Sequence, residues 1–198
     1  MYSPIELAFK YLNHLRLASS GKGHGIHSPF VYEFVSEVLN DNRNYYPYEA
    51  IEGIRYELLR DQRVIEVEDY GKSSGLTGCR KIARIAHRSL STEKFGRLLF
   101  RIVNHYQPKH MVELGTSLGI SGAYLAAANP ASVLLTLEGS PSIAQRAGET
   151  FSKLDLNNVR QITGNFDDTL EEVIGSAPAT DLLYIDGNHR KEPLLKYF

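Results

Sequence analysis

The sequence has few of the features that mark secreted, membrane-bound or nucleic-acid-binding proteins. Its single cysteine, Cys79, has no internal partner for a disulfide, which indicates a reducing compartment such as the cytoplasm. No apolar run is long enough to span a membrane, and charged residues interrupt the apolar N-terminal segment, which argues against a signal peptide. The net charge of −1 provides no field for nucleic acid or an anionic membrane. We therefore expect a cytoplasmic protein that binds neither nucleic acid nor membrane.

The 198 residues and 42% hydrophobic content suit one globular domain with an appendage. Residues 1–90 are rich in tyrosine and charge. Ser-Pro pairs at 3–4 and 28–29 are typical helix starts, and they predict helices over 3–15 and 28–39. A third helix is expected over 49–60, a strand or extended segment over 63–70, and a loop over 71–78. We expect this region to form a helical cap that contributes to a substrate site, although packing of a helical layer is the favoured interpretation of its tyrosines.

Residues 91–198 alternate between strand and helix patterns. After a helix that begins at residues 91–92 and stops before Pro108, strands are expected at 110–114, 133–138, 159–163 and 181–186, with helices at 119–128, 141–154 and 168–175. Such alternation predicts βαβ units and a parallel sheet with right-handed crossovers. The expected fold is therefore α/β, with a mostly parallel sheet.

A glycine-containing loop follows the first of these strands, and it reads E-L-G-T-S-L-G from Glu113 to Gly119. Ligands of doubly wound sheets bind outside the carboxyl ends of the strands. A P-loop is excluded because no lysine follows Gly119. A dinucleotide-binding site is disfavoured because the loop lacks the middle glycine of the G-x-G-x-x-G fingerprint. The spacing fits the E/D-x-G-x-x-x-G loop that binds S-adenosylmethionine, and the remaining alternative is a βα turn without a ligand.

Polar residues also stand at the tips of the next three strands. Glu138, before Gly139, is placed to accept hydrogen bonds from both hydroxyls of a ribose, a role shared by NAD and S-adenosylmethionine sites. The segment Asn165, Phe166 and Asp167 is placed beside an adenine, or else caps the following helix. Two further residues, Asp186 and His189, follow the fourth strand; Asp186 suits an ammonium group or a divalent cation, and His189 is either a general base or a surface histidine.

From about Phe95 onward the sequence resembles the class I S-adenosylmethionine-dependent methyltransferases, closest to the small-molecule O-methyltransferases of the catechol O-methyltransferase type. The resemblance runs through KFGRLLFRIVNHYQPKHMVELGTSLGIS, TLEGSPSIAQR, ITGNFDDTLEEV and DLLYIDGNH. The segment HGIHSPFVYEFV (24–35) also resembles a segment that precedes this domain in uncharacterised bacterial methyltransferases. The resemblance implies a Rossmann-like doubly wound, mostly parallel sheet with strand order 3-2-1-4. It also implies methyl transfer to an oxygen of a small molecule. The absence of an NPPY or DPPY motif after the fourth strand argues against a DNA amino group as acceptor.

The resemblance also implies roles for single residues. The loop with Glu113, Gly115, Thr116, Ser117 and Gly119 would hold the methionine and ribose parts of S-adenosylmethionine. The ribose would contact Glu138 and Gly139, and the adenine would face Asn165, Phe166 and Asp167. Asp186 matches a position that ligates Mg²⁺ in the family, and His189 matches by spacing a lysine that acts there as general base.

Two features depart from the family pattern. His189 replaces the lysine, and the sequence stops one short segment after the fourth strand, where the family continues with about three more strands. We therefore expect an incomplete, C-terminally truncated sheet that lacks the other metal ligands, with an edge through which a homodimer can form. Two alternatives to the enzyme remain: a non-catalytic module that binds S-adenosylmethionine or a protein partner, and, more weakly, an NAD-dependent oxidoreductase.

Overall fold

The structure is a computed structural model that describes residue 9 and residues 28–69, 76–165, 169 and 179–187. The chain divides into two compact units, Met1–Arg43 and Asn44–Phe198. In the first unit, α2 (Pro29–Glu33) continues into the π-helix η1 (Phe34–Leu39), where the sequence predicted a single α-helix. Ser28 caps α2, as its position before Pro29 predicted, because its side chain accepts a hydrogen bond from the Val31 amide at 3.4 Å. The helices expected over 3–15 and 168–175 lie outside the described residues.

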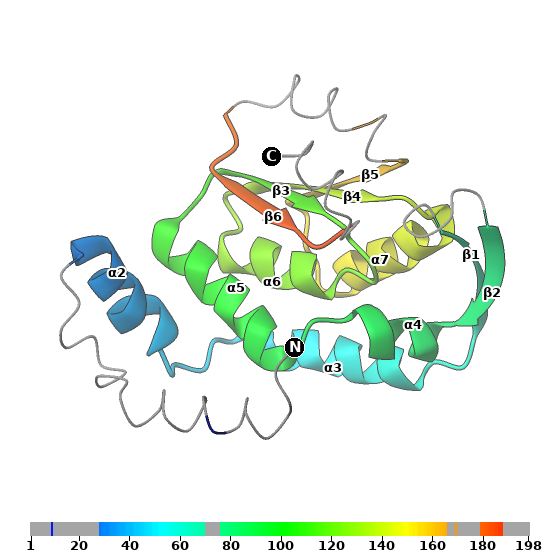
Figure 1. The fold of residues 1–198 in the computed structure, drawn as a ribbon, viewed down its shortest axis with the longest axis horizontal. Helices are drawn as coiled ribbons and strands as arrows, with labels where there is room; N and C mark the ends of the chain where they lie inside the picture. The colour runs from blue at the N-terminus through cyan, green and yellow to red at the C-terminus, as the bar shows by residue number, and fades with distance from the viewer. Residues whose placement is uncertain (1–8, 10–27, 70–75, 166–168, 170–178, 188–198) are drawn as a thin grey trace. The chain divides into compact units, whose positions relative to one another are not determined.

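The second unit contains a parallel four-stranded sheet (Figure 1). Its strands are β3 (His110–Leu114), β4 (Val133–Glu138), β5 (Val159–Thr163) and β6 (Leu182–Ile185). They lie in the order β5-β4-β3-β6, which confirms the expected 3-2-1-4 arrangement. In this order the chain crosses from β5 over to β6, so the carboxyl ends of β3 and its neighbours form the switch point at which such sheets bind ligands.

Three helices lie on one face of this sheet (Figure 1). They are α5 (Glu93–Tyr106), α6 (Ile120–Ala128) and α7 (Pro141–Lys153), close to the ranges expected from the sequence. Thr92 caps α5 by accepting a hydrogen bond from the Phe95 amide, and Gln107 ends the helix with a positive φ of 50°. These local signals set the helix ends, and the ends of α6 and α7 in turn set the loops at the strand tips.

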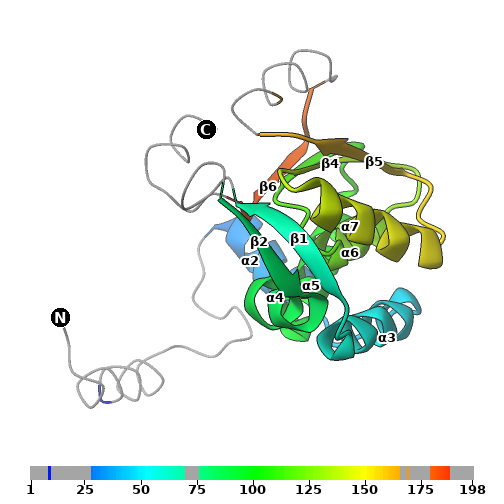
Figure 2. The same ribbon diagram turned by 90° about the vertical axis from the view of Figure 1, so that its right-hand side faces the viewer.

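Two further helices and a hairpin complete the second unit. The helices are α3 (Pro47–Arg60) and α4 (Ile82–Ser89). The hairpin pairs β1 (Val64–Asp69) antiparallel with β2 (Leu76–Lys81), β1 packs against α7, and β2 leads directly into α4 (Figure 2). The expected strand at 63–70 is confirmed as β1, whereas residues 76–78, expected in a loop, begin β2. The sequence analysis also missed α4, although its buried residues Ile82, Ala83, Ile85 and Ala86 have helical spacing.

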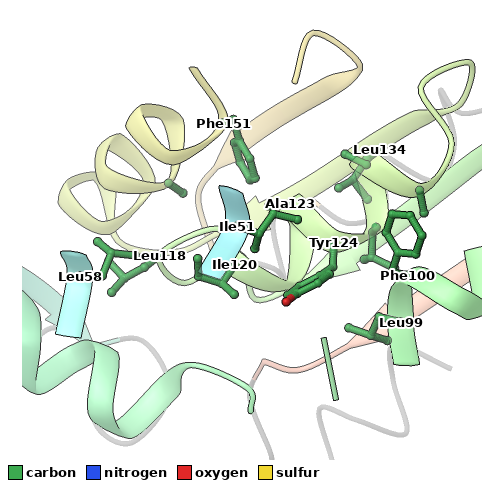
Figure 3. Packing of buried hydrophobic residues seen from close by; sticks show 14 of the residues in the cluster. Ile51, Leu58, Leu99, Phe100, Leu118, Ile120, Ala123, Tyr124, Leu134 and Phe151 are labelled. Atoms are coloured by element: carbon green, nitrogen blue, oxygen red, sulfur yellow. The ribbon is translucent and has the colours of Figure 1, made fainter. Parts of the chain in front are cut away.

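The main core forms between the sheet and these helices (Figure 3). It includes Phe100 from α5, Tyr124 from α6, Leu134 from β4 and Phe151 from α7, and Ile51 and Leu58 of α3 belong to the same cluster. A smaller cluster around Val112, Leu114 and Leu137 lies on the other face of the strands, because successive strand side chains point to opposite faces. Residues 44–90 therefore share one core with the sheet. The division near residue 90 into a substrate region and a cofactor region stays a prediction.

None of the helices in the described ranges is long and apolar enough to cross a bilayer.

Candidate functional site

The loop between β3 and α6 makes a tight turn that glycine permits. Gly115 has a φ of 103° and Gly119 a φ of 85°, conformations that side chains rarely adopt. The amides of Gly115 and Thr116 both donate to the Leu137 carbonyl at 3.0 Å, which ties the turn to β4. A Cβ at Gly115 would lie 2.9 Å from the backbone of Asp186. The glycine thus allows the β3 and β6 tips to approach closely.

Glu138 at the tip of β4 is held by backbone donors from two loops. Its Oε2 accepts a hydrogen bond from the Ser117 amide at 2.9 Å, and its Oε1 accepts one from the Ser140 amide at 3.0 Å. Burial raises the pKa of Glu138, while the amides of Ser140, Ser117 and Gly139 lower it in part. Each oxygen keeps a further lone pair, so the oriented carboxylate can still accept two hydroxyl donors from a ligand.

Glu113 lies beneath the loop rather than at its surface. Its side chain is fully buried on the helix side of the sheet, and its Oε2 accepts a hydrogen bond from Thr136 Oγ1 at 2.6 Å. The Thr136 hydroxyl is in turn 2.6 Å from that of Thr116. Among the described residues Glu113 Oε1 has no hydrogen-bond partner. Burial raises the pKa of Glu113 to about 7, and the hydroxyls of Ser121 and Thr136 oppose part of that rise.

Asp186 follows β6 and faces the same loop. Its amide donates to the Leu114 carbonyl at 2.9 Å, and its Oδ2 accepts a hydrogen bond from the Tyr184 hydroxyl at 3.0 Å. Desolvation and the negative charge of Asp186 both raise the pKa of Tyr184. Tyr184 is therefore protonated at neutral pH and acts as the donor that orients this carboxylate.

These strand tips border one cavity of about 450 Å³, within the range of small-molecule sites. Of the residues expected to bind a cofactor, seven line it: Gly115, Thr116, Ser117, Glu138, Gly139, Asn165 and Asp186. Glu113 and Gly119 do not line it. The buried Glu113 accepts a hydrogen bond from Thr136, and Gly119 precedes α6 and packs against Phe151. Phe166, Asp167 and His189 lie outside the described residues. The cavity thus brings together residues that were predicted at the tips of all four strands.

The remaining lining comes largely from residues between Val67 and Ser91, in a region that was expected to contribute to a substrate site but in which none of these residues was named. Ile120 and Ser121 come from α6, Ser140 and Ile143 from the start of α7, and Gly187 from the segment after β6; β1, β2, α4 and the loop after α4 supply the rest. Ser89 at the end of α4 lies 2.8 Å from Ser117, hydroxyl to hydroxyl, across 28 positions of sequence. The helical spacing of the apolar residues in α4 is a signal from which this helix could have been predicted, but the spacing does not show what the polar face of the helix meets.

Asp186 was also expected to ligate Mg²⁺. The described residues contain no group of three or more His, Cys, Asp or Glu side chains positioned around a common point. Since Mg²⁺ usually needs several oxygen ligands, the residues described do not by themselves build a metal site around Asp186.

Comparison with known proteins agrees with this geometry. Residues 112–198 match a family model described as a methyltransferase domain. No curated protein matches the chain.

Several solved structures share the fold. An O-methyltransferase from Streptomyces achromogenes involved in tomaymycin synthesis, solved with S-adenosylmethionine, is 25% identical, with 55% of this chain and 51% of that one covered and a TM-score of 0.52. An O-methyltransferase from Bacillus cereus, solved with S-adenosylhomocysteine, is 20% identical, with 85% and 66% covered and a TM-score of 0.56. A putative O-methyltransferase from Klebsiella pneumoniae is 21% identical, with 81% and 62% covered and the same TM-score of 0.56.

The chain thus spans between about half and two thirds of the length of these structures. The family match begins within β3 and covers the glycine loop and the tips of all four strands of the parallel sheet. Residues 112–198 accordingly match the model of a methyltransferase-domain family, and the described part of the chain shares the Rossmann-like fold of these solved O-methyltransferases.

Proposed function

We propose that the cavity binds S-adenosylmethionine and that the protein transfers its methyl group to an oxygen of a small-molecule acceptor. The observation that carries the proposal is the convergence of the glycine loop, Glu138 and Asp186 on one cavity of ligand size, about 450 Å³. The family match of residues 112–198 and the cofactor-bound O-methyltransferases of the same fold support it.

Each part of the cofactor has a matching group in the cavity. The free lone pairs of Glu138 suit the two ribose hydroxyls, which are donors that a carboxylate binds well. Asn165 at the tip of β5 suits the edge of an adenine, and the turn at Gly115–Ser117 gives the methionine end close access to the backbone. Phe166 and Asp167 are proposed on the adenine side from their sequence position.

The cofactor supplies an electrophilic methyl group on a sulfonium. As the acceptor oxygen forms its bond to the methyl carbon, the carbon–sulfur bond breaks, its electron pair remains on sulfur, and the acceptor's proton passes to a base. The contribution of this chain is mainly to hold the two reactants in line and to exclude water. Asp186, oriented by Tyr184, is proposed beside the reacting centre, with His189 proposed as the base.

Two further expectations belong to this proposal. The single cysteine supports a reducing, cytoplasmic location. A homodimer is proposed through β6, which forms one edge of the sheet in the part of the chain described.

The test is a calorimetric titration of the purified chain with S-adenosylhomocysteine, with NAD as the comparison ligand. We expect the first to bind and NAD not to bind. Glu138→Gln should weaken binding about tenfold or more. In the parent chain the amides of Ser117 and Ser140 each donate to one carboxylate oxygen of Glu138; in the variant one of these amides would face the NH₂ group of the glutamine, which is also a donor.

The matched control is Glu66→Gln, an exposed glutamate on β1 that does not line the cavity. Its affinity for S-adenosylhomocysteine should equal that of the parent chain. A folded parent chain that binds NAD in preference to S-adenosylhomocysteine, or binds neither, would contradict the proposal.

A further inference from the structure

The cavity has a basic wall that the proposed cofactor does not explain. Three arginines line it: Arg80 from β2, and Arg84 and Arg88 from α4. Arg84 and Arg88 are four residues apart, so they lie on the same face of α4. The acidic residues at the strand tips have partners of their own: Glu138 accepts from the Ser117 amide of the glycine loop, and Asp186 accepts from the Tyr184 hydroxyl of β6.

Arg84 and Arg88 have no counter-ion within the described ranges. Neither side chain forms an ion pair or hydrogen bond with any residue that the structure describes, and both residues are exposed. Arg84 lies in the first turn of α4, where the helix dipole disfavours a positive charge, and two like charges four residues apart repel each other. The helix dipole favours the positive charge of Arg88 in the last turn, but nothing within α4 stabilises the positive charge of Arg84.

The charge of the proposed cofactor bears on the role of the three arginines that line the cavity. S-adenosylmethionine carries a sulfonium, an ammonium and one carboxylate, so it is a net cation. The guanidinium groups of Arg84 and Arg88 would oppose the binding of this cation, although water screens these exposed side chains and the carboxylates of Glu68, Glu138 and Asp186 in the same cavity offset part of their charge. An anionic group bound between the arginines and the sulfonium would remove that repulsion.

We propose that Arg84 and Arg88 bind an anionic group of the methyl acceptor, a carboxylate or a phosphate. Guanidinium groups match both anions, since their planar N–H donors pair with two oxygens at once. The proposal rests on the function proposed above and specifies its substrate class: an acidic small molecule, oriented by its charge so that its hydroxyl meets the methyl group. Arg80, which has other contacts, adds positive charge to the same wall.

The test uses the whole chain saturated with S-adenosylhomocysteine, titrated at low ionic strength with inorganic phosphate and, separately, with benzoate. We expect at least one anion to bind. Binding of phosphate alone would indicate a phosphorylated acceptor, and binding of benzoate alone would indicate a carboxylic acid. The Arg84→Gln/Arg88→Gln variant should weaken anion binding about tenfold or more while its affinity for S-adenosylhomocysteine stays unchanged.

The matched control is Arg160→Gln, an exposed arginine on β5 that does not line the cavity, and it should leave anion binding unchanged. Failure of both anions to bind the loaded chain would overturn the inference while leaving the proposed function intact, and so would unchanged anion binding by the double variant. Loss of S-adenosylhomocysteine affinity in the double variant would also overturn it, because the arginines would then hold the cofactor's own carboxylate. If S-adenosylhomocysteine does not bind the folded parent chain, the proposed function fails first and the inference falls with it.

Discussion

Glu113 shows how burial changes the meaning of a residue in a sequence motif. The motif places an acidic side chain two residues before Gly115, and we expected that side chain at the ligand. The carboxylate instead points into the helix layer, where a Cβ at Gly122 would lie 2.8 Å from its Oε2. Through Thr136 it reaches Thr116, which lines the cavity. Glu113 therefore supports the site through other side chains.

The buried carboxyl of Glu113 gives a pH dependence with a definite sign. Its pKa is raised from 4.5 to about 7 in the folded state, so between these values the folded protein binds more protons than the unfolded chain. The free energy of unfolding should therefore decrease as pH rises from about 4.5 to 7, by on the order of 2–3 kcal/mol from this group. Urea unfolding at several pH values should show that Glu113→Gln removes this part of the decrease.

The control for this experiment is again the exposed Glu66→Gln, which should keep the pH dependence of the parent chain. A decrease of the same size in Glu113→Gln and in the parent would show that the buried carboxyl does not titrate in this range.

At the level of elements, the contact between α5 and α6 depends on one glycine. A Cβ at Gly96 would overlap the ring of Tyr124, whose side chain is fully buried and whose hydroxyl donates to Glu52 Oε1 at 2.6 Å. The glycine thus lets α5 lie close to α6, and α6 begins at the glycine loop of the cavity. The packing of two helices and the position of the site are therefore coupled.

Gly96→Ala should destabilise the protein by about 1–3 kcal/mol, because the buried tyrosine has to move from its packed position. Denaturant unfolding measures the loss. Gly53→Ala is the matched control: Gly53 lies in α3 with nothing within 4 Å of the added carbon, so it should stabilise by about 0.5–1 kcal/mol through helix propensity. Equal effects of the two substitutions would contradict the packing argument.

For the whole molecule, the division into two compact units leads to a deletion experiment. The main core draws on residues from Tyr48 onward, and the cavity is lined by residues from Val67 to Gly187. A fragment of residues 44–198 should therefore unfold cooperatively and bind S-adenosylhomocysteine as the full chain does. Thermal unfolding followed by circular dichroism, with calorimetry on the same samples, tests both expectations. A fragment without a cooperative transition would show that residues 1–43 belong to the folding unit.

The resemblance to a known family supplied the order of the strands, whereas the sequence patterns by themselves determined the strands and most of the strand-tip residues that line the cavity. These features are local: hydrophobic period, helix caps and glycines at turns depend on neighbours within a few residues. The correspondence is close for Gly115 and Glu138, each of which lies at the end of a strand in the expected register.

Only the tertiary structure decided which side chains share the cavity. The Glu113 carboxylate points away from the cavity in which it was expected. The contact of Ser89 with Ser117 and the arginines of α4 bring residues that are distant in sequence to the same cavity. A helical period shows that α4 has an apolar and a polar face, but the packing of its apolar face decides what the polar face meets. The chemistry of the strand tips is therefore readable from the sequence, whereas the charge of the wall that shares their cavity follows from the packing of α4.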